Sequence, residues 1–258
     1  MSFEGVTSRR AFLGTVVGGA TVALAGCSND SNNGSTGTPT NTPTPTSSGL
    51  EAQLQTVREA TADFEDPQAA LQNGFQPGGP YVPGMGWHFQ NPEWAQEAAQ
   101  NGFDLEKPPT LTYVETDDGL TLGSVEYAGP AQAVPESPDL FDDADADATE
   151  SWGTHAAATH VFATPDGEQT NPEDVTFDEW TTPDYWAEFS PPDSDLEAGD
   201  TVSLNWGTAS GKEGDRTERV ADVVTTHPEL RALHVWTHME NPEGVFAPVN
   251  PRLTSDSG

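Results

Sequence analysis

Apolar residues recur at helical spacing in the stretch LEAQLQTVREATADF, residues 50–64. The apolar positions that share one face of this stretch are Leu50, Leu54, Val57 and Phe64. Thr61 is the one polar member of the stripe, and the period of about 3.6 residues predicts an amphipathic helix. Asp66 and Pro67 have the form of a helix cap and a first-turn proline, which predicts a second, short helix as far as Gln72.

Further along the chain, runs of residues typical of β-strands follow the segments with helical spacing. Two of them, TLTYVET (110–116) and LTLGSVEYAG (120–129), are joined by Asp117-Asp118-Gly119, which is typical of a hairpin. TVSLNW (201–206) and RALHVWTH (231–238) predict further strands. Because the helices precede the strands instead of alternating with them, we expect a single globular α+β domain, with N-terminal helices followed by a mainly antiparallel β-sheet.

The first 27 residues have the organisation of an export signal. SRRAFL (8–13) is a twin-arginine motif, and it leads into an apolar run that ends at Gly26. This run is too short to span a hydrocarbon core of about 30 Å at about 1.5 Å per residue, so it predicts a signal peptide. LAGC (24–27) is the pattern of a lipobox, in which Cys27 is lipidated. We therefore expect a cell-surface protein anchored by lipid to the outer face of the cytoplasmic membrane.

The rest of the chain divides into a linker and one domain. Residues 28–48 are rich in Thr, Pro and Ser and contain no large apolar residue, which indicates an extended, semi-rigid spacer. Residues 49–258 form the predicted globular domain, which is long enough to bury a full core. A long acidic insertion is expected around 136–200, with loops at 136–150 and 164–200.

The charge of the chain indicates its habitat. It holds 42 acidic and 9 basic residues, for a net charge of −33, and only two of the basic residues are lysines. Concentrated salt screens the repulsion within such a surface, so we expect a halophilic archaeal source. An acidic tail that binds a partner fits less well, because the acidic residues are spread along the chain. Nucleic acid is excluded as a partner, since the chain has no basic footprint for phosphates.

Several classes of chemistry lack support in the sequence. Cys27 is the only cysteine, so the chain cannot form an internal disulfide or a thiol pair. No Gly-x-Ser-x-Gly motif is present, which removes the usual signature of a serine hydrolase. The six histidines are therefore the main candidates for chemistry.

Two histidines belong to similar short motifs. GMGWHFQNP (84–92) contains His88, and its HFQNP portion is echoed by HMENP (238–242). His234 and His238 would lie about 13 Å apart along a strand, too far to share one ion, although a helix would bring them onto one face. Val235, Trp236 and Thr237 favour the strand, so we expect only one of this pair to be a ligand.

The remaining histidines carry weaker signals. His155 and His160 are five residues apart, which would put them on different faces of a helix or of a strand. His227 precedes Pro228, and this pair predicts a turn with an exposed side chain. For each histidine taken alone, packing against a tryptophan is the competing interpretation.

Three of these motifs together resemble an uncharacterised family of secreted bacterial and archaeal proteins. The resemblance rests on GMGWHFQNP, SVEYAGP and ALHVWTHMENPEGVFAPVNP, which cover about a quarter of the domain. It singles out His88, Glu126 and His234, whereas other members more often carry an aromatic residue at the position of His238. Residues 136–225 depart from the family pattern and resemble a halophile-specific insertion, which argues against a role for His155 or His160.

Two hypotheses of function follow. In the first, His88, Glu126 and His234 form a mononuclear metal site for zinc, iron, copper or manganese, open to water or a small ligand, with His155, His160 and His238 as weaker candidates. The glycines before His88 would let the backbone approach the site, and Trp87 and Phe89 would pack on either side of its ring. In the second, the domain is a non-catalytic ligand-binding or structural module without metal. The sequence leaves open whether the protein is an enzyme.

Overall fold

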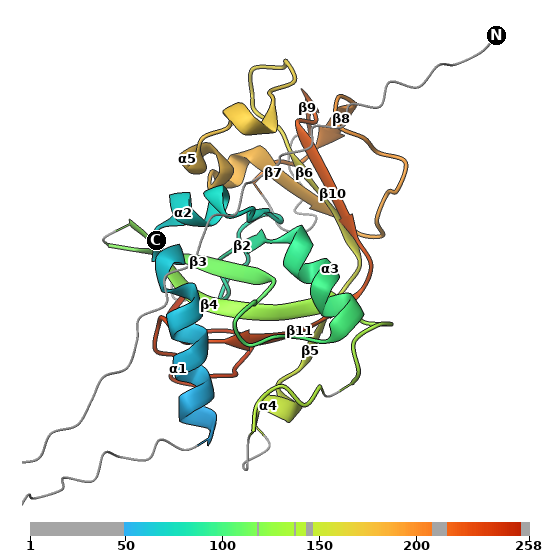
Figure 1. Cartoon of the computed structure of the whole chain (residues 1–258). Coiled ribbons are helices and arrows are strands. Elements are labelled where there is room, and N and C mark those ends of the chain that lie inside the picture. Colours follow the sequence, from blue (N-terminus) through green and yellow to red (C-terminus); the bar gives the residue numbers. More distant parts are fainter. Residues whose placement is uncertain (1–48, 118, 137, 143–146, 208–215, 254–258) are drawn as a thin grey trace, which may run out of the picture. The chain divides into compact units, whose positions relative to one another are not determined.

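A six-stranded antiparallel sheet lies at the centre of the computed structural model (Figure 1). Its strand order is β1-β2-β3-β4-β11-β5, so segments far apart in the sequence pair side by side. The strands are β1 (Gln76–Pro77), β2 (Trp87–Gln90), β3 (Thr110–Thr116), β4 (Gly119–Pro130), β5 (Gly153–His155) and β11 (Leu230–Val235). The predicted hairpin, β3-β4, forms the middle of this sheet, and the predicted α+β class is confirmed.

The structure describes residues 49–117, 119–136, 138–142, 147–207 and 216–253. All of these belong to one compact unit, Pro45–Gly258. The predicted signal peptide with Cys27, the linker 28–48 and Asp118 of the hairpin turn lie outside the described residues. None of the helices in the described ranges is long and apolar enough to cross a membrane.

The N-terminal helices form where the apolar stripe predicts them. They are α1 (Gly49–Thr61), the 3-10 turn η1 (Ala62–Glu65) and α2 (Pro67–Gln72). The Asp66 side chain accepts a hydrogen bond of 2.9 Å from the Gln68 amide, which is the predicted cap of α2. Phe64 of η1 packs in the core on Phe75, which follows α2, with the ring centroids 5.1 Å apart. The two predicted helices are therefore confirmed.

A third helix, α3 (Pro92–Asn101), was not predicted, and it packs against β4. The Asn91 side-chain oxygen accepts hydrogen bonds of 3.1 Å from the Glu93 and Trp94 amides, and Pro92 occupies the first turn. The second Asn-Pro motif works in the same way, because the Asn241 oxygen accepts a hydrogen bond of 3.0 Å from the Glu243 amide. The echo between the two motifs is therefore explained by a shared way of starting a turn.

The two faces of the central sheet differ in character, and β2 shows this most clearly. Trp87 and Phe89 are buried in the core, where Phe89 packs on Tyr113 with ring centroids 5.3 Å apart. Side chains alternate along a strand, so His88 and Gln90 point to the opposite face. The prediction that Trp87 and Phe89 flank the His88 ring is therefore wrong.

The Gly-Met-Gly turn before β2 also has a different role from the predicted one. Gly86 has φ +107°, and a Cβ there would clash with the Tyr113 carbonyl oxygen. The glycine therefore lets β2 begin close against β3, its partner in the sheet. It does not bring the backbone up to a ligand.

Two smaller sheets accompany the central one. One has the order β10-β6-β7 and the other pairs β8 with β9. Their strands are β6 (Ala158–Phe162), β7 (Trp186–Phe189), β8 (Thr201–Leu204), β9 (Thr217–Val220) and β10 (Val223–His227). The remaining elements are short: α4 (Asp147–Glu150), η2 (Pro172–Asp174), α5 (Phe177–Trp180), η3 (Pro183–Tyr185) and η4 (Pro251–Leu253).

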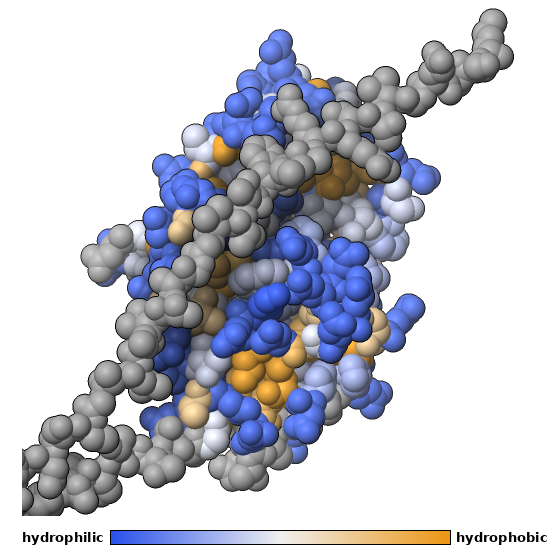
Figure 2. All heavy atoms as spheres, viewed as in Figure 1, coloured by the Kyte–Doolittle hydropathy of each residue, from blue (hydrophilic) through white to orange (hydrophobic). Residues whose placement is uncertain are grey.

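The acidic segment 164–200 is therefore more than a loop. It contains α5 and β7, so the loop prediction is wrong for those residues. Phe177 of α5 stacks on Phe89 of the central sheet, with ring centroids 5.3 Å apart and an angle of 26° between the rings. Trp186 is fully buried against Phe162. Acidic residues dominate the sequence of this segment because most of its surface is exposed, as the largely hydrophilic face in Figure 2 illustrates.

Phe177→Ala should destabilise the whole domain. The ring joins the acidic segment to the main core, and removal of a buried phenylalanine ring costs about 3–5 kcal/mol. We expect a matching fall in the free energy of unfolding in denaturant titrations at high salt. The exposed Glu173→Ala, four residues earlier, is the control and should change it little. A loss of less than about 1 kcal/mol for Phe177→Ala would show that the segment does not support the core.

Candidate metal centre

Three strands of the central sheet, β2, β4 and β11, bring His88, Glu126 and His234 together. Glu126 on β4 pairs directly with His234 on β11. His88 on β2 pairs with Thr112 on β3, which in turn pairs with Ser124, two residues before Glu126. All three side chains project from the face opposite the aromatic core, because each alternates with buried apolar neighbours.

Small polar side chains fill the sheet between His88 and Glu126. Thr112 and Ser124 are fully buried, and their hydroxyl groups hydrogen-bond to each other. The Thr112 hydroxyl also donates to the Ser124 carbonyl oxygen at 3.0 Å. Their low bulk leaves the space above β3 to the larger His88 and Glu126 side chains.

The donor atoms of the three residues lie close together. His88 Nε2 is 3.8 Å from Glu126 Oε2, and His234 Nε2 is 3.4 Å from Glu126 Oε1. One donor atom from each of the three residues can be chosen so that all lie within 4.8 Å of one another. The side chains are 12%, 5% and 2% exposed for His88, Glu126 and His234 respectively. The structure thus unites the three residues that the sequence singled out.

These separations match the edges of a coordination polyhedron. Imidazole nitrogens and carboxylate oxygens bind zinc at about 2.0–2.2 Å, and two such ligands at a tetrahedral angle are about 3.3 Å apart. The observed 3.4 Å and 3.8 Å are close to this value. The group could therefore hold a metal ion with only small side-chain adjustments.

The histidine nitrogens at this site lack ordinary partners. His88 Nε2 and both ring nitrogens of His234 are buried and make no hydrogen bond with any residue in the described part of the chain. A buried polar atom without a partner costs about 1–3 kcal/mol. The His234 ring stacks on Trp236, with the ring centroids 6.4 Å apart and an angle of 19° between the ring planes. The ring is thus fixed by packing, and its Nε2 atom faces the carboxylate.

Burial sets the charge states. It disfavours an imidazolium and lowers the pKa of His88 from 6.5 to about 4, and it lowers the pKa of His234 as well. Burial alone would raise the pKa of Glu126, but the surrounding His234, His88 and His155 rings outweigh it and lower that pKa. The group therefore combines neutral rings with a carboxylate anion at neutral pH, which is the form that binds metal.

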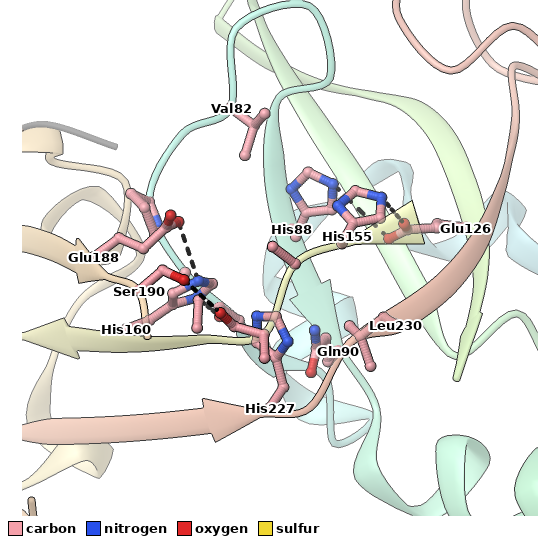
Figure 3. A pocket seen from close by; sticks show the side chains of 16 residues that line it. Val82, His88, Gln90, Glu126, His155, His160, Glu188, Ser190, His227 and Leu230 are labelled. Atoms are coloured by element: carbon pink, nitrogen blue, oxygen red, sulfur yellow. Dashed lines mark hydrogen bonds and ion pairs between the residues drawn. The ribbon is translucent and has the colours of Figure 1, made fainter. Parts of the chain in front are cut away.

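The site opens into a cavity of about 260 Å³, shown in Figure 3. Among its described lining residues, the titratable ones are His88, Glu126, His155, His160, Glu188 and His227. An ion at Glu126 could therefore also bind water or a small ligand from the cavity.

His155 belongs to this group, contrary to the argument from the family pattern. It ends β5, which pairs with β11, and its Nε2 atom lies 3.4 Å from Glu126 Oε1. In Figure 3 the His155 ring lies beside that of His88, and both are directed toward Glu126. The side chain is 31% exposed, so it lies at the mouth of the site.

His160 and His227 also face the cavity. The prediction that His155 and His160 diverge is wrong, because they lie on two separate strands, β5 and β6, and not on one. The prediction of an exposed His227 is wrong too: the residue ends β10 and is half-buried, with its ring 5.1 Å from that of His160. Glu188, on β7, went unnoticed because it is one carboxylate among many in an acidic segment.

His238 lies apart from the cavity. Its Nε2 atom hydrogen-bonds to the Thr61 hydroxyl at 2.8 Å, and its Nδ1 atom lies 3.4 Å from Glu65. The residue follows the end of β11 at Val235. The prediction that His234 and His238 do not share an ion therefore agrees with the structure, which pairs His238 with α1 and η1.

Comparisons of this chain with protein-family models, curated proteins and solved structures found no match. The site is therefore interpreted from its own geometry.

The low pKa of His88 predicts a specific loss of stability in acid for metal-free protein. The unfolded chain takes up the proton near pH 6.5 and the native ring only near pH 4, so the stabilisation is complete above pH 6.5 and is lost as the pH falls to 4. The free energy of unfolding should fall by about 3 kcal/mol more in the wild type than in His88→Gln over this interval. Denaturant titrations in chelator at each pH measure this difference. Equal pH dependence in the two proteins would contradict the burial argument.

Proposed function

We propose that this domain binds a first-row transition-metal ion through His88, Glu126 and His234, with His155 as a fourth donor. The observation that carries the proposal is the convergence of three Nε2 atoms on one buried carboxylate, at 3.4–3.8 Å. Packing alone would not explain why the Nε2 atoms of several histidines are directed at one carboxylate. The His88 and His234 rings are also neighbours, with centroids 5.8 Å apart and an angle of 81° between their planes.

Charge balance supports a cation at this position. Neutral rings leave the Glu126 carboxylate as a buried anion, and an unpaired buried charge is strongly unfavourable. A divalent ion would neutralise it and would also give the Nε2 atoms a partner. A proton shared between a ring and Glu126 is the competing explanation, and it corresponds to a ligand-binding or structural module without metal.

The donor set restricts the identity of the ion. Imidazole favours zinc, copper and iron, and a carboxylate also suits manganese. Calcium and magnesium prefer oxygen ligands throughout, so a site with three imidazoles selects against them. The cavity beside Glu126 would leave room for a bound water or a small ligand, which such ions can activate or polarise.

We also propose where the protein works. The twin-arginine motif and the LAGC sequence support export and anchoring by lipid on Cys27, and the Thr- and Pro-rich residues 28–48 would hold the domain away from the membrane. The net charge of −33 with two lysines supports a halophilic archaeal source.

The metal proposal predicts which substitutions change metal content. His88→Ala and Glu126→Gln should each lower the metal content of protein purified from its own host by about one ion per chain, because they remove a donor or its charge. His155→Ala should weaken binding without abolishing it, since the side chain lies at the mouth of the site. Inductively coupled plasma mass spectrometry measures the content.

His238→Gln is the matched control. It replaces a hydrogen-bonded histidine that lies outside the cavity, so it should leave metal content unchanged. If His88→Ala and Glu126→Gln fold, as judged by circular dichroism, and retain the wild-type metal content, the metal site is excluded and the module without metal is favoured.

The anchor proposal is tested by Cys27→Ser. Without the thiol no lipid can be attached, so the variant should move from the membrane fraction to the medium, as measured by immunoblotting of both fractions. Ser28→Ala, next to the lipobox, is the control and should stay with the membrane. A Cys27→Ser protein that remains in the membrane fraction would refute the lipid anchor.

A further inference from the structure

A second group of ligand-type side chains lines the other end of the same cavity. It consists of His160 on β6, Glu188 on β7 and His227 on β10, and these strands are neighbours in one sheet. His160 Nε2 lies 3.2 Å from Glu188 Oε2. None of the three belongs to the group around Glu126, so this cluster can be judged separately.

Backbone carbonyls fix the tautomer of both rings. His160 Nδ1 lies 2.6 Å from the Gly78 carbonyl oxygen, and His227 Nδ1 lies 2.8 Å from the Pro228 carbonyl oxygen. A carbonyl oxygen can only accept, so in each ring the proton is on Nδ1. The Nε2 atoms are then the ones that can offer a lone pair. Histidines that bind metals characteristically donate their other N–H group in this way.

The position of the His160 ring is specified by its surroundings. A Cβ at Gly79 would clash with Nδ1 and Cε1 of this ring, so only glycine allows the close approach. The ring is 13% exposed and the Glu188 side chain 24%. In Figure 3 His160 is connected by dashed lines to Glu188 and to a backbone oxygen. Gly78 and Gly79, which precede β2, thus hold the His160 ring of β6 in one orientation.

The contact between His160 and Glu188 requires a positive charge between the two atoms. With its proton on Nδ1, a neutral His160 would direct a lone pair at a carboxylate oxygen 3.2 Å away. Either a second proton on the ring or a metal ion relieves this repulsion. His227 is half-buried, and burial is the main cause that lowers its pKa. The centroid of its ring lies 5.1 Å from that of His160.

The electrostatics of the cavity favour a metal ion. Its described lining contains two carboxylates, Glu126 and Glu188, and no lysine or arginine. A cleft with this balance concentrates cations. We propose that His160 and Glu188 bind a second divalent transition metal and that the neighbouring His227 ring turns in as a third ligand, so that the cavity holds two ions. The turn of His227 is needed because the ligand atoms of these three residues do not already lie within 4.8 Å of one another, as those of His88, Glu126 and His234 do. This proposal goes beyond the first site and does not depend on it.

The number of bound zinc ions tests the proposal. The full mature protein, stripped with chelator and dialysed in concentrated salt, is titrated with Zn²⁺ by isothermal calorimetry, and bound zinc is counted by mass spectrometry. We expect about two ions per chain in the wild type and about one in His160→Gln and in Glu188→Gln. His238→Gln is the control and should keep both ions.

A variant that touches no ligand gives independent evidence. Gly79→Ala should displace the His160 ring and reduce the second ion while the first is kept. Folding of each variant is checked by circular dichroism, and the zinc-dependent rise in melting temperature provides a second measure of binding. Ser190→Ala, which changes the same end of the cavity without removing a ligand, is a further control and should keep both ions. If one test variant does not fold, the others of His160→Gln, Glu188→Gln and Gly79→Ala still decide the question.

The zinc measurements distinguish the absence of the second site from the absence of the first. If the second site is absent, His160→Gln and Glu188→Gln will bind as much zinc as the wild type, and the contact is then an imidazolium–carboxylate pair. If only the first site is absent, His88→Ala will bind as much zinc as the wild type while His160→Gln loses its ion. Loss of one ion in each of the two variants supports both sites.

Discussion

A carboxylate buried in the middle of the central sheet is the constraint on which the site depends. Glu126 is on the longest strand, between β3 and β11, and its side chain is only 5% exposed. Burial leaves it little access to water, so the protein must supply positive or polarisable partners. The imidazole rings of His88, His155 and His234 are those partners, and they come from three different strands. The strand order β2-β3-β4-β11-β5 brings these rings around one residue.

The sheet meets this need because its two faces are used for different purposes. Trp87, Phe89 and Tyr113 pack against the helices and supply the hydrophobic stabilisation, while His88 and Glu126 face the cavity. Because successive side chains along a strand point to opposite faces, the residues of the site do not interrupt the core. The price in stability of a buried polar face is offset by the aromatic packing on the other face, which extends to Phe177 of the acidic segment.

The sequence was sufficient for what local patterns determine. The apolar stripe of residues 50–64, the cap at Asp66 and the hairpin around Gly119 depend on neighbouring residues, and the structure has each of them. His88, Glu126 and His234 were singled out by the resemblance of their motifs to a family of secreted proteins, and not by a local pattern. Glu188 and His227 could not be identified, because their significance arises only from β7 and β10 pairing with β6, and no local feature specifies that pairing. The β-strand of residues 186–189 was not predicted for the same reason. Its buried residues lie in a segment with many exposed acidic residues, and the apolar pattern of a strand is not evident there.

The proposed metal binding would explain why so acidic a protein places histidines at this site. A chain with 42 acidic residues attracts cations over its whole surface, and in concentrated salt these are mainly alkali ions. Oxygen ligands alone would not distinguish a scarce transition metal from them, whereas imidazole nitrogen strongly favours the transition metal. Of the six histidines, His88, His155, His160 and His227 line the cavity and His234 lies against Glu126 behind it. Nitrogen donors are thus concentrated around the buried Glu126 carboxylate, which is where a choice between cations can be made.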